Sequence, residues 1–488
     1  MLACNFPLAP GGHARQATSA AIMQTIDAAA LLAGPTPTTL STSAPSPPAS
    51  PTPDWSTPGP TFEVRTASGD TLEALSGRLG VEPWQVASDE ALEPGVLLAP
   101  GTVARAPNLL GAVTPGVSLI PDGEVVDSPS AAGFDVGTYV QLAGGWLASY
   151  QEEIAPGRWA GGATIVRKVA DELSVNPRLL LALIEYRNGG LFGVPADPAS
   201  PYPLGFRIAG RSGLYQELMI AATQLNVGYY GWREGALVDI RFDDGTAVRL
   251  HPALNPGTAA VMHLMAVLLP RAQWNDSLYG SASLPALATS LFGDLWARSP
   301  DPILPPDLTQ PMLELPFAPG QRWSLTGGPH PAWNAGTPRG ALDFSPISGG
   351  AACDVSPWWA TAAAPGVIAR ADANAVALDL DGDGREQTGW VLVYLHLAQQ
   401  GMIAAGTRVE AGTPLGHPSC EGGRATGKHV HIARKFNGEW IAADGPVPFV
   451  LSGWRAVADK RDYYGSLVRG DEVVTSDSSG GRGSTIMR

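Results

Sequence analysis

The sequence predicts a multidomain protein in which a small α+β unit and a mostly α-helical middle domain precede a C-terminal, antiparallel all-β domain with a groove. Its 488 residues are enough for about three domains of about 150 residues each. Two Pro-rich segments, residues 34–60 and 301–312, have the composition of linkers. Apolar residues at helical spacing prevail in residues 136–300, whereas residues 313–456 carry short apolar runs typical of strands.

The charge and hydropathy of the chain argue against two kinds of partner. The net charge is −14 and the basic residues are not clustered, which argues against nucleic acid. No apolar run reaches the roughly 18 residues that a membrane-spanning helix needs, so we predict no transmembrane segment. We expect the protein to be a monomer.

Residues 1–33 contain the motif Leu2-Ala3-Cys4, which resembles the end of a bacterial lipoprotein signal, where the cysteine becomes the lipidated N-terminus. The charged start and apolar core of such a signal are missing, so this interpretation requires a true start upstream; the alternative is a chance match. The Pro/Ser/Thr-rich residues 34–60 resemble an extracytoplasmic stalk. We therefore expect a protein that is secreted or lipid-anchored at the cell envelope.

Residues 61–107 are predicted to form a compact βααβ unit. A strand at 62–64 precedes a helix that starts near Thr71, a second helix is expected at 82–86, and a strand returns at 97–103. The unit resembles a LysM domain, with the pattern carried by Gly69-Asp70-Thr71-Leu72, Arg78-Leu79-Gly80-Val81 and Leu98-Ala99-Pro100-Gly101-Thr102. The resemblance implies binding of N-acetylglucosamine-containing glycan and anchoring to the cell wall; the alternative is an unrelated small α+β module.

After a linker at 108–135, residues 136–300 are predicted to be helical, because Asn176 and Pro177 have the residue types preferred at a helix start. This helix resembles the opening of a lysozyme-like transglycosylase domain, in which such a helix ends in a catalytic Glu. Arg187 occupies the matching position here, and Glu185 lies two residues earlier, a rotation of about 200°. The resemblance implies a degenerate, sugar-binding helical domain; the alternatives are a structural spacer or an active muramidase.

Residues 313–456 are predicted to form the antiparallel β domain, and residues 457–488, which are rich in Ser and Gly near their end, a disordered tail. Five of the eight histidines lie between residues 330 and 431. His429 and His431 alternate with apolar residues on a predicted strand, so both side chains point to one face, about 6–7 Å apart. Such a pair can converge on a metal ion, although an isolated pair is more often two surface histidines.

A catalytic zinc site needs three protein ligands, commonly His and a carboxylate, and one open position. The segments around the clustered histidines resemble the lysostaphin-type zinc endopeptidases, which cut peptidoglycan peptides, and are closest to the β-lytic metallopeptidase and staphylolysin branch. The motifs that carry this resemblance are Gly328-Pro329-His330, Leu342-Asp343-Phe344, Tyr394-Leu395-His396-Leu397 and the run from Cys420 to His431.

The resemblance implies that His330, Asp343 and His431 bind one catalytic zinc ion. It also implies that His429 and His396 are the catalytic pair, which act on the attacking water and stabilise the tetrahedral intermediate. In lysostaphin the first histidine lies closer to the aspartate, and Arg339 occupies that nearer position here.

Two further features concern Cys and Asp residues. Cys353 and Cys420 would form a disulfide in an oxidising compartment, or else be buried thiols. Cys420 matches a disulfide cysteine of the β-lytic branch, but the family's partner position holds no Cys, so Cys353 would have to substitute. The carboxylates of a D-x-D-x-D-G motif, Asp379, Asp381 and Asp383, predict a calcium loop or an acidic hairpin turn; the twelfth position lacks the Glu of an EF-hand.

The combined prediction is a zinc-dependent endopeptidase that hydrolyses stem or cross-bridge peptide bonds of bacterial peptidoglycan and is anchored to the wall by the LysM unit. One alternative is a non-catalytic peptidoglycan-binding or regulatory protein that keeps the peptidase fold. The other is a glycan-cleaving muramidase that acts through the middle domain.

Overall fold

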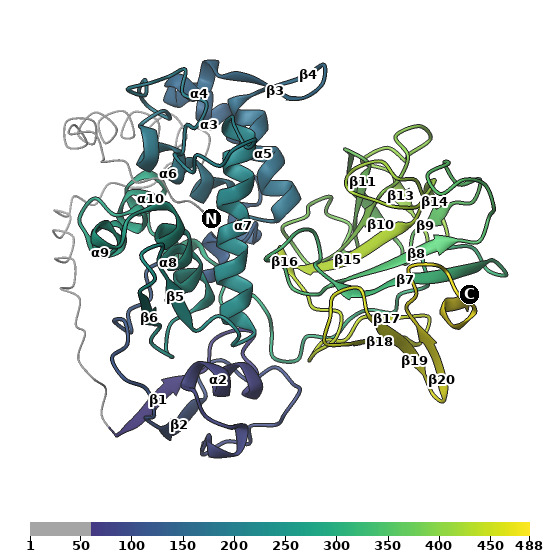
Figure 1. Cartoon of the computed structure of the whole chain (residues 1–488), viewed down its shortest axis with the longest axis horizontal. Coiled ribbons are helices and arrows are strands. Elements are labelled where there is room, and N and C mark those ends of the chain that lie inside the picture. The colour runs from purple at the N-terminus through teal and green to yellow at the C-terminus, as the bar shows by residue number, and fades with distance from the viewer. Residues whose placement is uncertain (1–59) are drawn as a thin grey trace, which may run out of the picture.

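Figure 1 shows the computed structural model of the chain, which describes residues 60–488. The predicted N-terminal segment with Cys4, and the linker at 34–60 except its last residue, lie outside the described residues. An N-terminal α+β unit lies at the bottom of Figure 1, a helical domain lies above it, and a β domain lies on the right. None of the helices within residues 60–488 is long and apolar enough to cross a membrane.

The N-terminal unit pairs strand β1 (Thr61–Arg65) antiparallel with β2 (Val103–Pro107) around helix α2 (Leu72–Leu79). The Thr71 side chain accepts the N–H of Ala74, which caps α2 at its N-terminus. The predicted second helix at 82–86 is wrong: only a 3-10 turn (Pro83–Gln85) forms, because the chain becomes extended at Val86 and Ala87 then bridges to β2. The returning strand also starts later than predicted, because a turn with a left-handed Gly101 (φ 89°) precedes it.

The helical domain packs its helices around α7, which contacts α8 and α5. Its core includes the apolar faces of α5 and α6, and α6 starts at Pro177 with Asn176 as its N-cap, as the sequence predicts. The helices are α3 (Val136–Ala143), α4 (Trp146–Ser149), α5 (Gly162–Leu173), α6 (Pro177–Asn188), α7 (Leu214–Arg233), α8 (Pro256–Leu268), α9 (Arg271–Tyr279), α10 (Leu284–Phe292) and α11 (Leu295–Arg298). Two hairpins are added, β3 (Gln151–Ala155) with β4 (Arg158–Gly161), and β5 (Asp239–Arg241) with β6 (Ala247–Arg249).

The β domain is built on a nine-stranded sheet in the order β13-β10-β11-β12-β15-β8-β7-β21, with β16 paired to β15. Every pair in it is antiparallel, as predicted. Its strands are β7 (Arg322–His330), β8 (Ala341–Pro346), β10 (Gly366–Asp372), β11 (Ala375–Asp379), β12 (Trp390–Leu395), β13 (Arg408–Val409), β15 (Val430–Phe436), β16 (Glu439–Trp440) and β21 (Thr485–Met487). A short pair, β9 (Ala360–Thr361) with β14 (Pro414–Gly416), and a second sheet complete the domain.

The expected disordered tail is wrong. Residues 450–475 form a four-stranded antiparallel sheet of β17 (Val450–Leu451), β18 (Trp454–Ala458), β19 (Gly465–Arg469) and β20 (Glu472–Thr475), and β21 then adds an edge to the main sheet. Leu467, Val474 and Ile486 are buried, so the segment contributes to the core. The Ser/Gly-rich residues between β20 and β21 form a turn held by the Asp477 carboxylate, which accepts the N–H groups of Ser479 and Gly481.

The three parts meet in a buried contact at the C-terminal end of α7. The Arg233 guanidinium donates to the Glu439 carboxylate of β16 at 2.8 and 2.9 Å, and it also donates to the carbonyl of Ser68 in the N-terminal unit. Both side chains of the ion pair are nearly excluded from solvent, at 9% and 2% exposure. The Tyr230 hydroxyl accepts the N–H of Trp440 at 2.9 Å. The interface between the β domain and the helical domain therefore contains a buried ion pair, Arg233 with Glu439.

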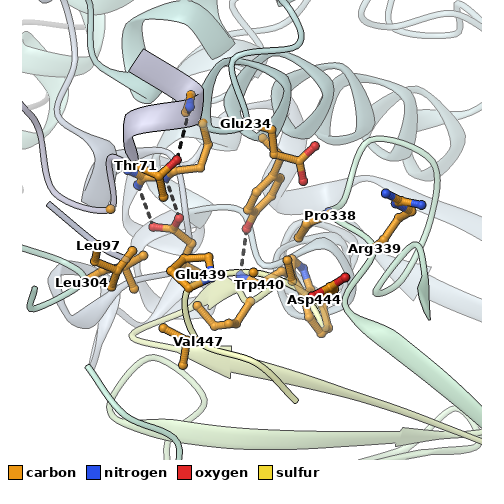
Figure 2. Close-up of a pocket in the computed structure, with 18 of the residues that line it drawn as sticks. Thr71, Leu97, Glu234, Leu304, Pro338, Arg339, Glu439, Trp440, Asp444 and Val447 are labelled. Atoms are coloured by element: carbon orange, nitrogen blue, oxygen red, sulfur yellow. Dashed lines mark hydrogen bonds and ion pairs between the residues drawn. The ribbon is translucent and has the colours of Figure 1, made fainter. Parts of the chain in front are cut away.

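A cavity of about 390 Å³ lies beside this contact and is lined by all three parts (Figure 2). Arg339, the residue at the alternative metal-ligand position of the sequence, lines this cavity together with Glu234 and Asp444. Its guanidinium donates to the carbonyl of Asp459. Burial raises the pKa of Glu234, and the charge of Arg339 opposes that increase. Arg339 therefore forms part of the cavity wall and is held by the backbone of Asp459.

Candidate metal centre

Antiparallel pairing places three predicted ligands on adjacent strands. His431 lies opposite Asp343 in the β15–β8 register, and the bulged β7–β8 pairing brings His330 beside Ala341. His330 is the last residue of β7, because bulges let the Gly-rich end of this strand stay paired. Gly327 is required there, since a Cβ atom on it would lie 2.5 Å from Oδ2 of Asp343.

The three ligand atoms converge on one point. Nε2 of His330 lies 3.1 Å from Nδ1 of His431, and each of these nitrogens lies 3.3 Å from Oδ1 of Asp343. All three side chains are buried. Oδ1 of Asp343 has no hydrogen-bond partner among the described residues. Two nitrogens and one carboxylate oxygen are the donor set that a tetrahedral zinc site with one open position uses.

Backbone carbonyls fix which ring nitrogen carries the proton. Nδ1 of His330 lies 2.8 Å from the carbonyl of Gly328, and Nε2 of His431 lies 2.8 Å from the carbonyl of Ala332. A carbonyl can only accept, so these nitrogens carry protons, and the opposite nitrogens are the ones available to a metal. Nε2 of His330 and Nδ1 of His431 therefore face each other across 3.1 Å, an arrangement that a cation between them stabilises.

The electrostatics of the site also favour positive charge. Burial opposes it, yet the charge of Asp343 raises the pKa of His330. Burial likewise opposes ionisation of Asp343, but His330 and His429 hold the pKa of that carboxyl well below its usual range. Burial lowers the pKa of His431, which keeps this ring neutral and able to bind a metal. The residues present therefore fit a zinc ion.

His396 and His429 lie next to the triad as a second pair, with ring centroids 4.4 Å apart. Nδ1 of His396 donates to the carbonyl of Glu421 and Nδ1 of His429 to that of Gly427, each at 2.8 Å, so both rings keep a free lone pair on Nε2. Nε2 of His429 lies 3.8 Å from Oδ1 of Asp343, close to the triad but outside the ligand set. Burial lowers the pKa of His396 to about 4, with His429 adding to the effect, so His396 is neutral at neutral pH.

His396 adopts a left-handed backbone conformation (φ 65°) immediately after β12 ends. Such a conformation is uncommon for residues other than glycine and is held here by neighbouring bonds. The His396 carbonyl accepts both the N–H and the hydroxyl of Ser419. The turn that follows β12 therefore brings this ring against His429.

A disulfide joins Cys353 to Cys420 (S–S 2.02 Å) next to this pair. Cys420 precedes Glu421, whose carbonyl orients His396, and Gly423 would place a Cβ atom 3.4 Å from the His396 ring. On the other side of the bridge, the Lys428 ammonium donates to the carbonyls of Gly349 and Ala351. The disulfide thus ties down the loop that supports His396.

Tyr463 is a candidate site residue that the sequence did not reveal. Its ring stacks on His330, with centroids 4.2 Å apart and planes 18° apart, and about half of the side chain is exposed. Burial raises the pKa of its phenol, and the charge of Asp343 adds to this. The residue lies in the segment predicted to be a tail; the strand-like run that directly follows it was the signal that could have identified an ordered segment.

Two cavities are lined by residues that neighbour the metal centre in sequence or in contact. One, of about 200 Å³, lies between the β3–β4 hairpin and loops of the β domain and is lined by Arg158, Tyr215, Trp333, Asn374 and Gly422 among others. Asn374 donates to the carbonyl of Leu397, the residue after His396. The other, of about 630 Å³, is lined by Thr326, Tyr463 and the turn between β20 and β21.

Two other predicted sites differ from the metal centre. Asp379, Asp381 and Asp383 gather their oxygens in a turn after β11, but Asp379 accepts the N–H groups of Asp381 and Gly384, which is the acidic-turn alternative; nothing supports calcium. The Glu185 carboxylate accepts the N–H groups of Leu191 and Phe192. It therefore holds the turn after α6.

The helical part of the chain is similar to a known protein family. Residues 118–305 match the family model described as LasA, N-terminal domain. The match covers the whole of the middle domain predicted at residues 136–300.

The most similar curated relatives are proteases. Protease LasA of Pseudomonas aeruginosa is 27% identical over 291 residues, which cover 56% of this chain and 65% of that protein. Beta-lytic metalloendopeptidases of Achromobacter lyticus and Lysobacter enzymogenes are 29% identical over 160 residues, 31% of this chain and 40% and 83% of theirs. The chain thus spans just under two thirds of the LasA protease. The predicted similarity to the β-lytic branch is confirmed.

Among solved structures, the M23 metalloprotease pseudoalterin, described as deep-sea, covers 34% of this chain at 24% identity with a TM-score of 0.29. The catalytic domain of lysostaphin from Staphylococcus simulans covers 25% at 22% identity with a TM-score of 0.18.

Proposed function

We propose that this protein is a zinc-dependent endopeptidase that hydrolyses peptide bonds of bacterial peptidoglycan. The observation that carries the proposal is the convergence of His330, Asp343 and His431, with two ring nitrogens and a carboxylate oxygen within 3.3 Å of one another. These three side chains would hold the zinc ion. When bound, zinc supplies a Lewis acid that polarises the scissile carbonyl and lowers the pKa of water.

His429 and His396 provide the proton transfers. Each donates from Nδ1 to a backbone carbonyl, which leaves Nε2 as the ring atom that can exchange a proton with water or substrate. One ring accepts the proton of the attacking water as the C–O bond forms, and the resulting imidazolium stabilises the negative charge on the substrate oxygen. The same proton then passes to the leaving amine as the C–N bond breaks. His396, with its pKa lowered to about 4, gives up such a proton readily.

The substrate class is supported by the relatives and by the shape of the site. The curated relatives are named protease and beta-lytic metalloendopeptidase, and a cavity of about 630 Å³ is lined by Tyr463, whose ring stacks on His330. The βαβ arrangement at residues 61–107, with its LysM-like motifs, supports binding to N-acetylglucosamine-containing glycan. We place the protein outside the cytoplasm, secreted or lipid-anchored, because its substrate is there.

The two alternatives are less well supported. A non-catalytic binding protein would not need both the ligand triad and a neighbouring histidine pair with free lone pairs. A muramidase would need a carboxylic acid free to reach a glycosidic oxygen, whereas Glu185 is bound to two backbone N–H groups.

Product analysis of digested peptidoglycan tests the proposal. Purified protein should release new peptide amino termini, which mass spectrometry detects; a zinc chelator should abolish the release and added zinc should restore it. New reducing or anhydro sugars without new peptide termini would support the muramidase instead, and intact peptidoglycan would support a binding protein.

A further inference from the structure

The loop that joins two members of the triad also contacts the third. This ligand loop, residues 331–340, connects His330 at the end of β7 to the start of β8, where Asp343 lies. Its Ala332 carbonyl accepts the Nε2–H of His431 at 2.8 Å, and the Ala332 N–H closes the loop by donating to the carbonyl of Pro338 at 2.9 Å. The position of this loop therefore sets which nitrogen of His431 faces the metal centre.

The far side of the ligand loop rests on helix α7 of the helical domain. The Asn334 amide donates to the Thr223 hydroxyl at 2.8 Å, and that hydroxyl donates to the carbonyl of Met219 at 2.7 Å, one turn earlier. The amide oxygen of Asn334 is buried without a partner within residues 60–488. Within residues 60–488, the Asn334 side chain therefore makes its hydrogen bond through the amide nitrogen, to Thr223.

Gly336 brings the loop backbone into direct contact with the same face of α7. A Cβ atom on Gly336 would lie 2.7 Å from Cγ2 of Val227 and 3.0 Å from the carbonyl oxygen of Thr223. Its φ of 100° is also a conformation that favours glycine. Thr223 and Val227 are four residues apart, so they are neighbours on one helix face.

The contact continues along the helix. Further along α7, Tyr230 and Arg233 bind β16, which pairs with β15, the strand of His431. In Figure 1, α7 is the long helix that runs along the boundary with the β domain. Helix α7 therefore contacts both the ligand loop and β16, the strand that pairs with the strand of His431.

We propose that α7 is a positioning element of the metal centre, in which Thr223 and Val227 hold the ligand loop so that Ala332 fixes the orientation of His431. The inference rests on the proposed function, because it concerns the zinc affinity of the same triad. It makes the helical domain a functional part of the site. Loss of a residue that orients a metal ligand directly weakens metal binding by about 10–100-fold, so we expect about tenfold for Thr223, which acts through Asn334 and the loop.

The test measures zinc affinity of the full chain by competition with a chromogenic chelator, and the visible spectrum of the cobalt-substituted protein. The variants are Thr223→Val, which removes the hydroxyl at constant shape, and Thr223→Ser, which keeps it. Ser174→Ala is the matched control, because the Ser174 hydroxyl also bonds across the same domain boundary, to the carbonyl of Gly438 at 2.6 Å, but away from the ligand loop.

Thr223→Val should weaken zinc binding about tenfold and shift the cobalt spectrum, whereas Thr223→Ser and Ser174→Ala should bind zinc within about threefold of the unmodified chain. Asn334→Ala should weaken binding equally, and the double variant should be no weaker than either single one. Equal affinities for Thr223→Val and the unmodified chain, or equal losses for Ser174→Ala, would overturn the inference alone. An unmodified chain that binds neither metal would instead refute the proposed function. If Thr223→Val does not fold, Asn334→Ala makes the same test from the loop side.

Discussion

Separate substitution of His429 and His431 should distinguish a proton-transfer residue from a metal ligand, although both lie on the same face of one strand. His431 contributes a ligand atom 3.1 Å from that of His330, whereas Nε2 of His429 stops 3.8 Å from Oδ1 of Asp343. His429→Ala should therefore keep all three ligands and lose a proton-transfer group. General acid–base groups contribute about 10²–10⁴-fold to rate, so we expect kcat/KM to fall by that factor, or about 3–5 kcal/mol in activation free energy.

His431→Ala should behave differently, because it removes a ligand. Its zinc affinity should fall by more than about 100-fold, since even residues that only orient ligands are worth about 10–100-fold. The assay pairs hydrolysis of a purified peptidoglycan peptide with zinc competition against a chelator, on both variants. If His429→Ala loses zinc as severely as His431→Ala, then His429 is a ligand, and the division of roles is wrong.

Two further predictions concern the scaffold around the site. Reduction of the disulfide between Cys353 and Cys420, or Ser at both positions, should lower the free energy of unfolding by about 2–5 kcal/mol, because the bridge closes a separation of 67 residues, and should lower kcat as the loop that orients His396 loosens. Scanning calorimetry and peptide hydrolysis with and without reductant measure this, and an unchanged Tm would contradict it. Burial alone would raise the pKa of Glu386, but Arg370 and Lys435 hold it below its ordinary value. The stability from this pair of ion pairs should therefore be present above the unfolded pKa of about 4.3 and be lost as pH falls through the folded pKa. Glu386→Gln should cost about 3–5 kcal/mol at neutral pH and flatten the acid side of the stability profile in urea titrations; a profile parallel to that of the unmodified chain would contradict the assignment.

The parts of the site that depend on local pattern could be predicted from the sequence. Alternation on a strand places His429 and His431 on one face, and antiparallel pairing then puts His431 opposite Asp343. The register itself could not be predicted, because it is fixed by bulges at Gly327 and by pairing between segments about 90 residues apart.

Other features depend on contacts that no local pattern reports. Tyr463 contacts His330 because β19 pairs with β18 and β20 with β19. The nearby Ser/Gly-rich turn led to the prediction of a disordered tail, so these strands were not predicted. The second helix of the N-terminal unit was predicted from Pro83 at an early helical position, but pairing of Ala87 with β2 outweighs that preference. The role of Thr223 depends entirely on a tertiary contact with a loop 111 residues away.

The Pro-rich segment at 301–312 marks a boundary in the sequence that is not a boundary in the folded protein. Ile303 and Leu304 are buried, and the Gln310 amide is bound to Arg434 and to the backbone of Val450. An excised β domain would carry Glu439 and the ligand loop without the groups that cover them here. The activity of the excised domain would therefore not equal that of the same domain in the intact chain. Weak activity after excision would reflect the loss of the contacts with the helical domain, and not weak intrinsic catalysis.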